Sequence, residues 1–128
     1  MDNEKDICRL IKPDASLISE IAAYRNAFLS AGSSMDGTGP LRRMEDPAEW
    51  LAFNRLLEKK ETVPSGLVPS EQFAFLRERD GAIVGMIQFR HSFNDFLRDF
   101  GGHIGYSVHQ NERRKGYAGR MLRYCVKV

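Results

Sequence analysis

Three consecutive cations and a glycine, Arg113-Arg114-Lys115-Gly116, stand where a strand-like segment gives way to a helix-like one. The first N–H groups of a helix have no intrahelical partner and carry partial positive charge, so a helix N-terminus is a natural anion site. Gly116 lets a ligand approach the backbone because it has no Cβ. The partial positive charge at this end of a helix repels cations. The cost of ordering three of them here is therefore offset only when an anion binds. The pattern favours a phosphate or pyrophosphate site; the alternative is a solvated surface turn.

The segments that must position this cluster begin with one strand and two helices. An apolar-polar alternation over 6–12, closed by Pro13, predicts the strand. The first helix is predicted from its capping residues (Asp14 or Ser16, and Gly32) and its apolar face (Ile18, Ile21, Ala22, Phe28 and Leu29). The second helix is predicted from its start at Asp46, Pro47 and Glu49 and its apolar face of Trp50, Phe53 and Leu57.

The second half of the chain predicts three strands and a last helix. Phe73 and Phe75 alternate on one side of a hairpin that turns at Asp80-Gly81 and returns over 83–89. A connection over 94–102 leads to a strand over 103–108. The last helix carries Ala118, Met121, Leu122 and Cys125 on one face. The predicted fold is α/β (α+β), β-α-α-β-β-β-α, with a mainly antiparallel sheet.

Length and composition bound the protein class. A chain of 128 residues with 42% hydrophobic residues suits a single domain over 1–128. A net charge of +2 is too small for general nucleic-acid binding. The positive charge is concentrated in the cation cluster, which favours a small anionic ligand. Cys8 and Cys125 show no metal-ligand or C-x-x-C spacing, so we expect reduced thiols and no metal site. No signal peptide or membrane span is recognisable, and we expect a cytoplasmic protein without membrane or nucleic-acid partners.

Several motifs around the cluster resemble the GNAT superfamily of N-acetyltransferases. Residues 113–118 resemble its R/Q-x-x-G-x-G/A motif, and GGHIGYSVHQNE over 101–112 resembles the fourth strand that leads into it. GYAGRMLRYCV over 116–126 resembles the helix that follows, and the order of the preceding elements also fits. Two further segments, MDGTGPL over 35–41 and VPSEQFAFLRE over 68–78, resemble a bacterial subgroup of predicted acetyltransferases.

The resemblance implies acetyl-CoA as cosubstrate and acetyl transfer to a primary amine by direct attack. The pyrophosphate would lie on backbone N–H groups of Arg113, Arg114, Lys115, Gly116, Tyr117, Ala118 and Gly119. The pantetheine arm would pair with the exposed edge of the fourth strand at Tyr106, Ser107 and Val108, and the N–H of Val108 would polarise the thioester carbonyl. That strand carries a bulge in the family, for which Gly105 is the best-suited residue.

Two side chains are candidates for the general base, because the amine must be neutral to attack. His103 stands at the start of the fourth strand and titrates in a suitable range. Glu112 is the second candidate. The alternative is that His103 only fills a strand end and that Glu112, like His109, belongs to a solvated loop. The family's usual general acid is a Tyr on a later helix; no matching position exists here, and Tyr117 and Tyr124 are not assigned its role.

The sequence stops at Val128, before the last strands and helix of the family's fold, so we expect a C-terminally truncated member. The alternative to an active enzyme is a non-catalytic fragment that binds CoA weakly or not at all. Such a chain would expose a sheet edge and the apolar face of its last helix, and we therefore expect a homodimer. A nucleotide- or RNA-binding module that stacks bases on Tyr106 and Tyr117 is disfavoured by the low net charge.

Overall fold

A computed structural model of the chain describes residues 6–90 and 104–125. The order of helices and strands is the predicted one: β1 (Cys8–Ile11), α1 (Ile18–Ala31), α2 (Pro47–Leu57), β2 (Ser70–Arg77), β3 (Ile83–Arg90), β4 (Ile104–Val108) and α3 (Tyr117–Cys125). Three short 3-10 turns lie at Ala15–Leu17, Leu41–Arg43 and Gln110–Glu112. The predicted α/β fold is confirmed. The residues His91, His103 and the connection 94–102 lie outside the described residues.

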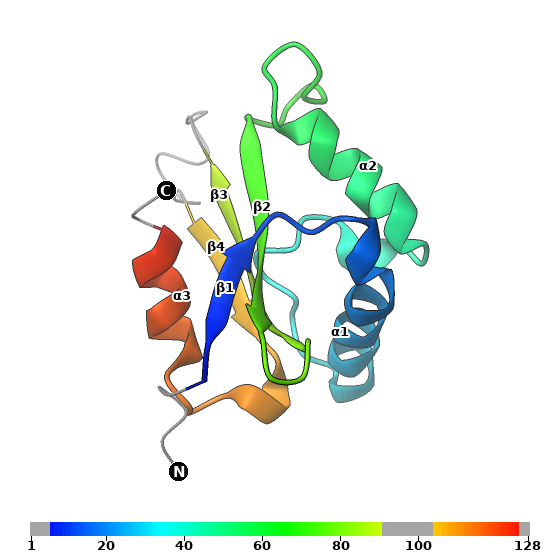
Figure 1. The fold of residues 1–128 in the computed structure, drawn as a ribbon. Coiled ribbons are helices and arrows are strands. Elements are labelled where there is room, and N and C mark those ends of the chain that lie inside the picture. Colours follow the sequence, from blue (N-terminus) through cyan, green and yellow to red (C-terminus); the bar gives the residue numbers. More distant parts are fainter. Residues whose placement is uncertain (1–5, 91–103, 126–128) are drawn as a thin grey trace.

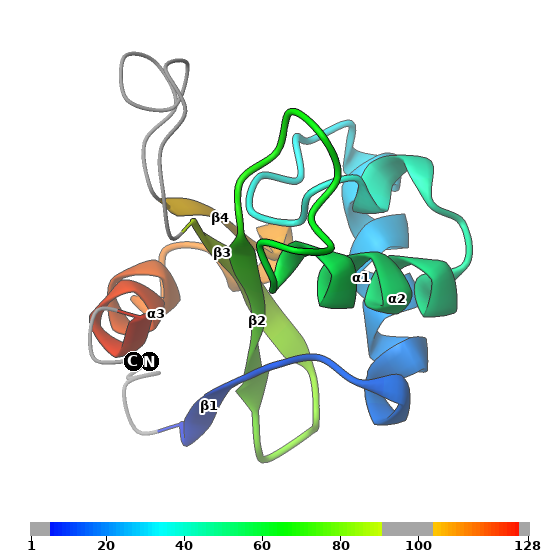
Figure 2. The same cartoon turned by 90° about the horizontal axis from the view of Figure 1, so that it is seen from above.

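The described strands form one antiparallel sheet in the order β1-β2-β3-β4. Helices α1 and α2 cover one face of this sheet, and α3 covers the other (Figures 1 and 2). Each face therefore has its own hydrophobic core, and the hairpin of β2 and β3 contributes to both. No helix in the described part of the chain is long and apolar enough to cross a membrane.

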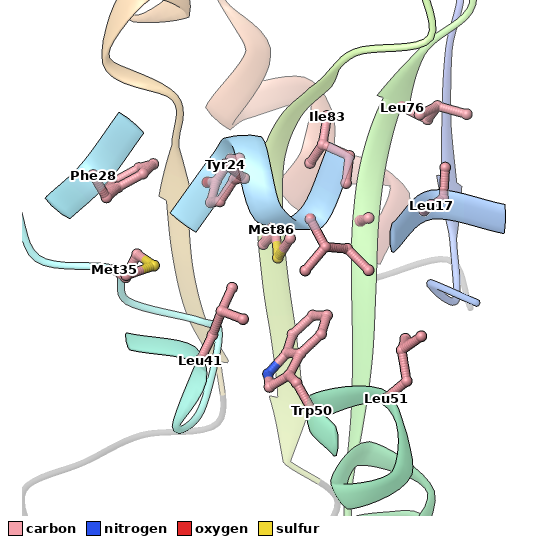
Figure 3. Close-up of a cluster of buried hydrophobic side chains, with 12 residues drawn as sticks. Leu17, Tyr24, Phe28, Met35, Leu41, Trp50, Leu51, Leu76, Ile83 and Met86 are labelled. Atoms are coloured by element: carbon pink, nitrogen blue, oxygen red, sulfur yellow. The ribbon is translucent and has the colours of Figure 1, made fainter. Parts of the chain in front are cut away.

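The first core lies between the sheet and the pair α1 and α2 (Figure 3). Helix α1 ends as predicted, at Gly32 in the left-handed conformation with φ +67°. Its buried face is formed by Ile21, Tyr24 and Phe28. The expected burial of Ile18 and Leu29 is wrong, since each is 37% exposed. The helix is rotated so that its largest side chain, Tyr24, reaches the sheet.

Helix α2 begins as its sequence predicts. The Asp46 carboxylate accepts a hydrogen bond from the N–H of Ala48 at 2.9 Å, and Pro47 occupies the first turn. Trp50 and Leu57 are buried, as expected. Phe53 is half-buried and lines a cavity instead of the core.

The second core lies between the sheet and α3, where Phe73, Phe75 and Ile87 meet Tyr117 and Met121. The apolar face of α3, expected to be exposed, is covered by the sheet, so it supplies no reason for the expected dimer. The bulge expected at Gly105 is also not found, because β3 and β4 pair in regular register from Ile104 to Val108. The register shift lies instead between β2 and β3, at Phe75/Leu76.

Candidate active site

Strand β4 ends the sheet, so one of its edges has no partner strand among the described residues. Bonded and non-bonded residue pairs alternate along an antiparallel ladder. The N–H of His109 donates to the carbonyl of Val84 at 2.8 Å, which fixes this alternation for β4. Ser107 therefore bonds inward to β3, while Tyr106 and Val108 turn their N–H and C=O groups to the open edge. The carbonyl of Val108 accepts a hydrogen bond from Arg113, and the other outward groups are available to an extended ligand.

The loop after β4 turns sharply twice before α3 begins. Arg114 has a φ of +65°, the one positive φ of a non-glycine residue in the described ranges, and Gly116 has a φ of +84°. A left-handed conformation costs a non-glycine residue about 1–2 kcal/mol, and such strain gathers at functional sites. A Cβ at Gly116 would meet nothing within 4 Å, so the position requires glycine for its conformation and not for lack of space.

The start of α3 presents free backbone donors. The carbonyl of Gly116 accepts a helical hydrogen bond from the N–H of Arg120 at 3.2 Å. The three N–H groups before Arg120 therefore have no intrahelical partner; they belong to Tyr117, Ala118 and Gly119. Together with the turns at Arg114 and Gly116, they form a cradle of the kind that binds phosphate.

The three cations of the cluster are not equivalent. Arg113 donates from Nε to the carbonyl of Val108 at 3.1 Å, and its guanidinium lies 5.8 Å from the centroid of the Phe28 ring. Lys115 pairs with Glu112, with 3.0 Å between Nζ and Oε1. Arg114 is exposed. Protein groups thus offset the cost of ordering Arg113 and Lys115, which corrects the expectation that only a bound anion could do so.

A buried arginine of β2 ties this loop to the sheet. The side chain of Arg77 is 5% exposed and donates to both carboxylate oxygens of Glu112, at 2.8 and 3.2 Å. It also donates to the carboxylate of Asp80, at 2.7 and 3.0 Å, and to the phenol oxygen of Tyr117 at 3.2 Å. The Tyr117 hydroxyl in turn donates to Asp6 at 2.9 Å. Both ends of the loop 112–117 are therefore held by one side chain.

Glu112 and His109 are more enclosed than a solvated loop would allow. Burial alone would raise the pKa of Glu112, but hydrogen bonds from Arg77 and Lys115 hold the pKa below its ordinary value. This carboxylate is therefore a weakened base with two cationic partners. His109 packs edge-on against Tyr24 and its Nδ1 accepts from the N–H of Asn111 at 3.1 Å. Burial lowers the pKa of His109.

The tyrosines of the region differ in what they offer. Tyr24 is 1% exposed, and its hydroxyl lies 2.9 Å from Oγ of Ser107 on β4. Burial raises the pKa of the Tyr24 phenol, which therefore stays protonated. Tyr117 is 1% exposed, so its ring is not available for base stacking, while Tyr106 is 42% exposed. The alternative that stacks bases on both rings is thus contradicted at Tyr117.

A cavity of about 500 Å³ opens beside the N-terminal end of β4. Its walls are Ile104, Gly105 and Tyr106 of β4, Arg90 of β3, and Asp36 and Gly37 from the loop after α1. The phosphate cradle follows the C-terminal end of β4. A ligand extended along the open edge would therefore have the cradle at one end and this cavity at the other.

Sequence reasoning found the cradle and the strand edge but missed three contributors. Arg77 and Tyr24 act through contacts with Glu112 and Ser107, which lie 35 and 83 residues away. Asp36, which lines the cavity beside β4, was not among the predicted site residues. Arg77 continues the alternation of Phe73 and Phe75, so the sequence could have predicted that its side chain is buried. A buried charge requires acidic partners, and this would have pointed to the contact with Glu112.

A comparison with protein families matches residues 39–128 to the Acetyltransferase (GNAT) family. A search of curated proteins finds no match to the chain. Among the residues that the structure describes, no three His, Cys, Asp or Glu side chains gather as a metal-binding group. The cradle, the open strand edge and α3 all lie inside the matched region.

Proposed function

Because this chain belongs to the GNAT acetyltransferase family, we propose that it transfers the acetyl group of acetyl-CoA to a primary amine by direct attack on the thioester. The single observation that carries the assignment to this site is the continuity of cradle and strand edge. The outward groups of Tyr106 and Val108 and the N–H groups at the start of α3 follow one another along the chain, separated by the turn 109–116.

The cosubstrate would be held mainly by backbone groups. Its pyrophosphate would accept hydrogen bonds from the loop 113–116 and from the N–H groups of Tyr117, Ala118 and Gly119, with the exposed Arg114 adding charge. Its pantetheine arm would pair with Tyr106 and Val108 as a further strand. Since the carbonyl of Val108 already accepts from Arg113, the N–H of Val108 is the group left for the ligand.

The proton of the attacking amine needs a separate acceptor, because an amine must be neutral to attack. We propose His103 for this role, as the sequence predicts, and a positioning role for Glu112. The Glu112 carboxylate is engaged by Arg77 and Lys115, so taking up a proton would weaken both ion pairs. A His103→Gln variant that keeps full turnover and an unchanged pH profile would contradict the assignment to His103.

Calorimetric titration with acetyl-CoA and with CoA tests the proposal. We expect micromolar binding that Gly116→Ala weakens at least several-fold, because the cradle requires a φ of +84°. Gly66→Ala is the matched control: Gly66 has a φ of +87°, and a Cβ there would also meet nothing within 4 Å. Equal affinities of the two variants would place the pyrophosphate elsewhere.

The alternative is a non-catalytic member of the family, and the same titration distinguishes it. Binding without turnover on any amine would leave a CoA-binding domain, and absence of binding by a folded chain would refute the cradle. We also propose that the 128 residues form a single domain that self-associates as a homodimer. Light scattering at increasing protein concentration tests the dimer, and a mass that stays at one chain would refute it.

A further inference from the structure

A second cavity adjoins the one beside β4. It has a volume of about 360 Å³ and lies between the loop 39–43, helix α2, the loop 66–70 and the end of β3. Its wall is largely apolar, with Phe53, Leu57, Leu67 and Val68, and the exposed residue Arg43 also lines it. Arg90 lines both cavities, which therefore meet at the end of β3.

The loop 35–39 contributes residues to both cavities and is fixed by buried hydrogen bonds. Nε1 of Trp50 donates to the carbonyl of Thr38 at 2.8 Å, and Nε2 of Gln72 donates to the carbonyl of Gly37 at 2.7 Å. Figure 3 shows the indole of Trp50 inside the first core, next to Leu41, which follows this loop in the chain. Gly37 has a φ of +75° and is buried. The loop 35–39 is therefore a built wall of the site.

This wall is pressed directly on β4. A Cβ at Gly37 would come within 2.4 Å of the carbonyl oxygen of Gly105 and 2.6 Å of Cα of Tyr106. Backbone thus lies against backbone at β4, the strand whose open edge the acetyl-CoA arm would follow. Asp36, the residue before Gly37, is exposed and lines the cavity beside this strand. Among the described residues that line the two cavities, Asp36 is the one acidic residue.

The charges of the two cavities differ in sign and in place. Asp36 offers an anion at the end of β4, and Arg43 offers a cation in the apolar cavity beyond Arg90. Arg90 has an interaction of its own within the protein, so the cationic role is assigned to Arg43. A cation alone or an anion alone would satisfy only one of these groups. An acceptor with an amine, a carboxylate and an apolar body would satisfy both and fill the apolar space.

We propose that the acceptor of this enzyme is an amino acid, or a close analogue, with an apolar side chain. Asp36 binds its amine beside Tyr106, Arg43 binds its carboxylate, and the cavity of Phe53, Leu57, Leu67 and Val68 holds its side chain. This inference rests on the proposed function for one point, that the amine faces the thioester beside Tyr106. The two cavities and their charges are independent of it.

Binding of three matched probes tests the proposal. L-Phenylalanine carries all three features, phenethylamine lacks the carboxylate, and 3-phenylpropionate lacks the amine. We expect L-phenylalanine to shift the NMR resonances of the amides of Thr38, Gly39 and Tyr106 and to bind about tenfold more tightly than either analogue, which is the weight of one charge-assisted contact.

Two variants separate the charged contacts. Asp36→Asn is expected to weaken L-phenylalanine and phenethylamine about tenfold and to leave 3-phenylpropionate unchanged. Arg43→Gln is expected to weaken L-phenylalanine and 3-phenylpropionate and to leave phenethylamine unchanged. Glu45→Gln and Arg55→Gln, which change exposed charges outside both cavities, serve as controls with no effect.

The outcomes distinguish this inference from the proposed function. Equal affinity for the three probes, or shifts confined to other surfaces, would overturn the assignment of an amino-acid acceptor even if acetyl-CoA binds. Probe selectivity in a chain that binds no acetyl-CoA would refute the proposed function and leave the amino-acid site standing. In either case Arg43→Gln should bind acetyl-CoA as the parent chain does, since Arg43 lines neither the cradle nor the cavity beside β4.

Discussion

Replacement of Arg77 by Met should destabilise the protein and weaken acetyl-CoA binding together. The substitution keeps an apolar stem of similar length and removes every hydrogen bond to Glu112, Asp80 and Tyr117. Glu112 would keep only Lys115 as a cationic partner. The loop 112–117 would lose its tie to the sheet, and the strained conformation of Arg114 would no longer be held.

The magnitude follows from the exposure of the partners. Removing one partner of a fully buried ion pair costs about 3–5 kcal/mol. Arg77 is 5% exposed, but its partners Glu112 and Asp80 are 16% and 43% exposed, so water can replace part of what they lose. We therefore expect a loss of about 2–3 kcal/mol in the free energy of unfolding. Arg77→Lys should fall between, because an ammonium cannot hold both carboxylates in a planar fork.

Urea denaturation at pH 7 measures the loss, and calorimetry measures the affinity for acetyl-CoA in water. Arg79→Met is the matched control: its side chain is 59% exposed and pairs with Asp6 at 3.4 Å, so its removal should change stability by at most about 0.5 kcal/mol. The reasoning is refuted if Arg77→Met loses less than about 1 kcal/mol or if it binds acetyl-CoA as tightly as the parent chain.

Three further predictions concern the same surroundings. Tyr24→Phe should cost about 1–2 kcal/mol of stability because it leaves Oγ of Ser107 buried without its partner, and Tyr24→Phe with Ser107→Ala should cost less than the two single changes added; simple additivity in urea denaturation would contradict this. The lowered pKa of Glu112 stabilises the fold above the pKa of the unfolded chain, so the urea midpoint should fall as the pH drops below about 5, and less so in Arg77→Met; equal pH slopes would contradict this. Trp50→Phe should weaken binding of L-phenylalanine, because the carbonyl of Thr38 loses its donor, without changing the affinity for acetyl-CoA; a loss of both in calorimetry would argue for general unfolding.

The elements could be predicted from the sequence because their signals are local. Asp46 and Pro47 fix the start of α2, Gly32 ends α1, and Asp80-Gly81 turns the hairpin, each within a few residues of the structure it determines. The cradle was predictable for the same reason, since Gly116 and the cations are adjacent in the chain. The rotation of α1 was not, because Tyr24 faces the sheet through a bond to Ser107 that no local pattern encodes.

The bulge depends on long-range pairing, and the state of the cations depends on how the loop 109–116 folds back on itself. The family pattern predicted a bulge at Gly105, but the strand is regular there. Gly105 instead lacks a side chain where the backbone of Gly37 packs against it. The cations were read as unpaired because their partners, Val108 and Glu112, are found only once the loop has folded back. The acceptor cavities are likewise formed by segments far apart in the chain.

The hydrogen bond from Trp50 to Thr38 gives the protein a built-in optical reporter. Trp50 is the single tryptophan of the chain, so the whole indole emission comes from a side chain bonded to the wall of the proposed acceptor site. Indole emission responds to the hydrogen bond and polarity around its N–H. Occupancy of the acceptor site should therefore change the intrinsic fluorescence, while occupancy of the distant cradle should leave it nearly constant. A label-free titration can thus follow the two substrates separately and reveal the order in which they bind.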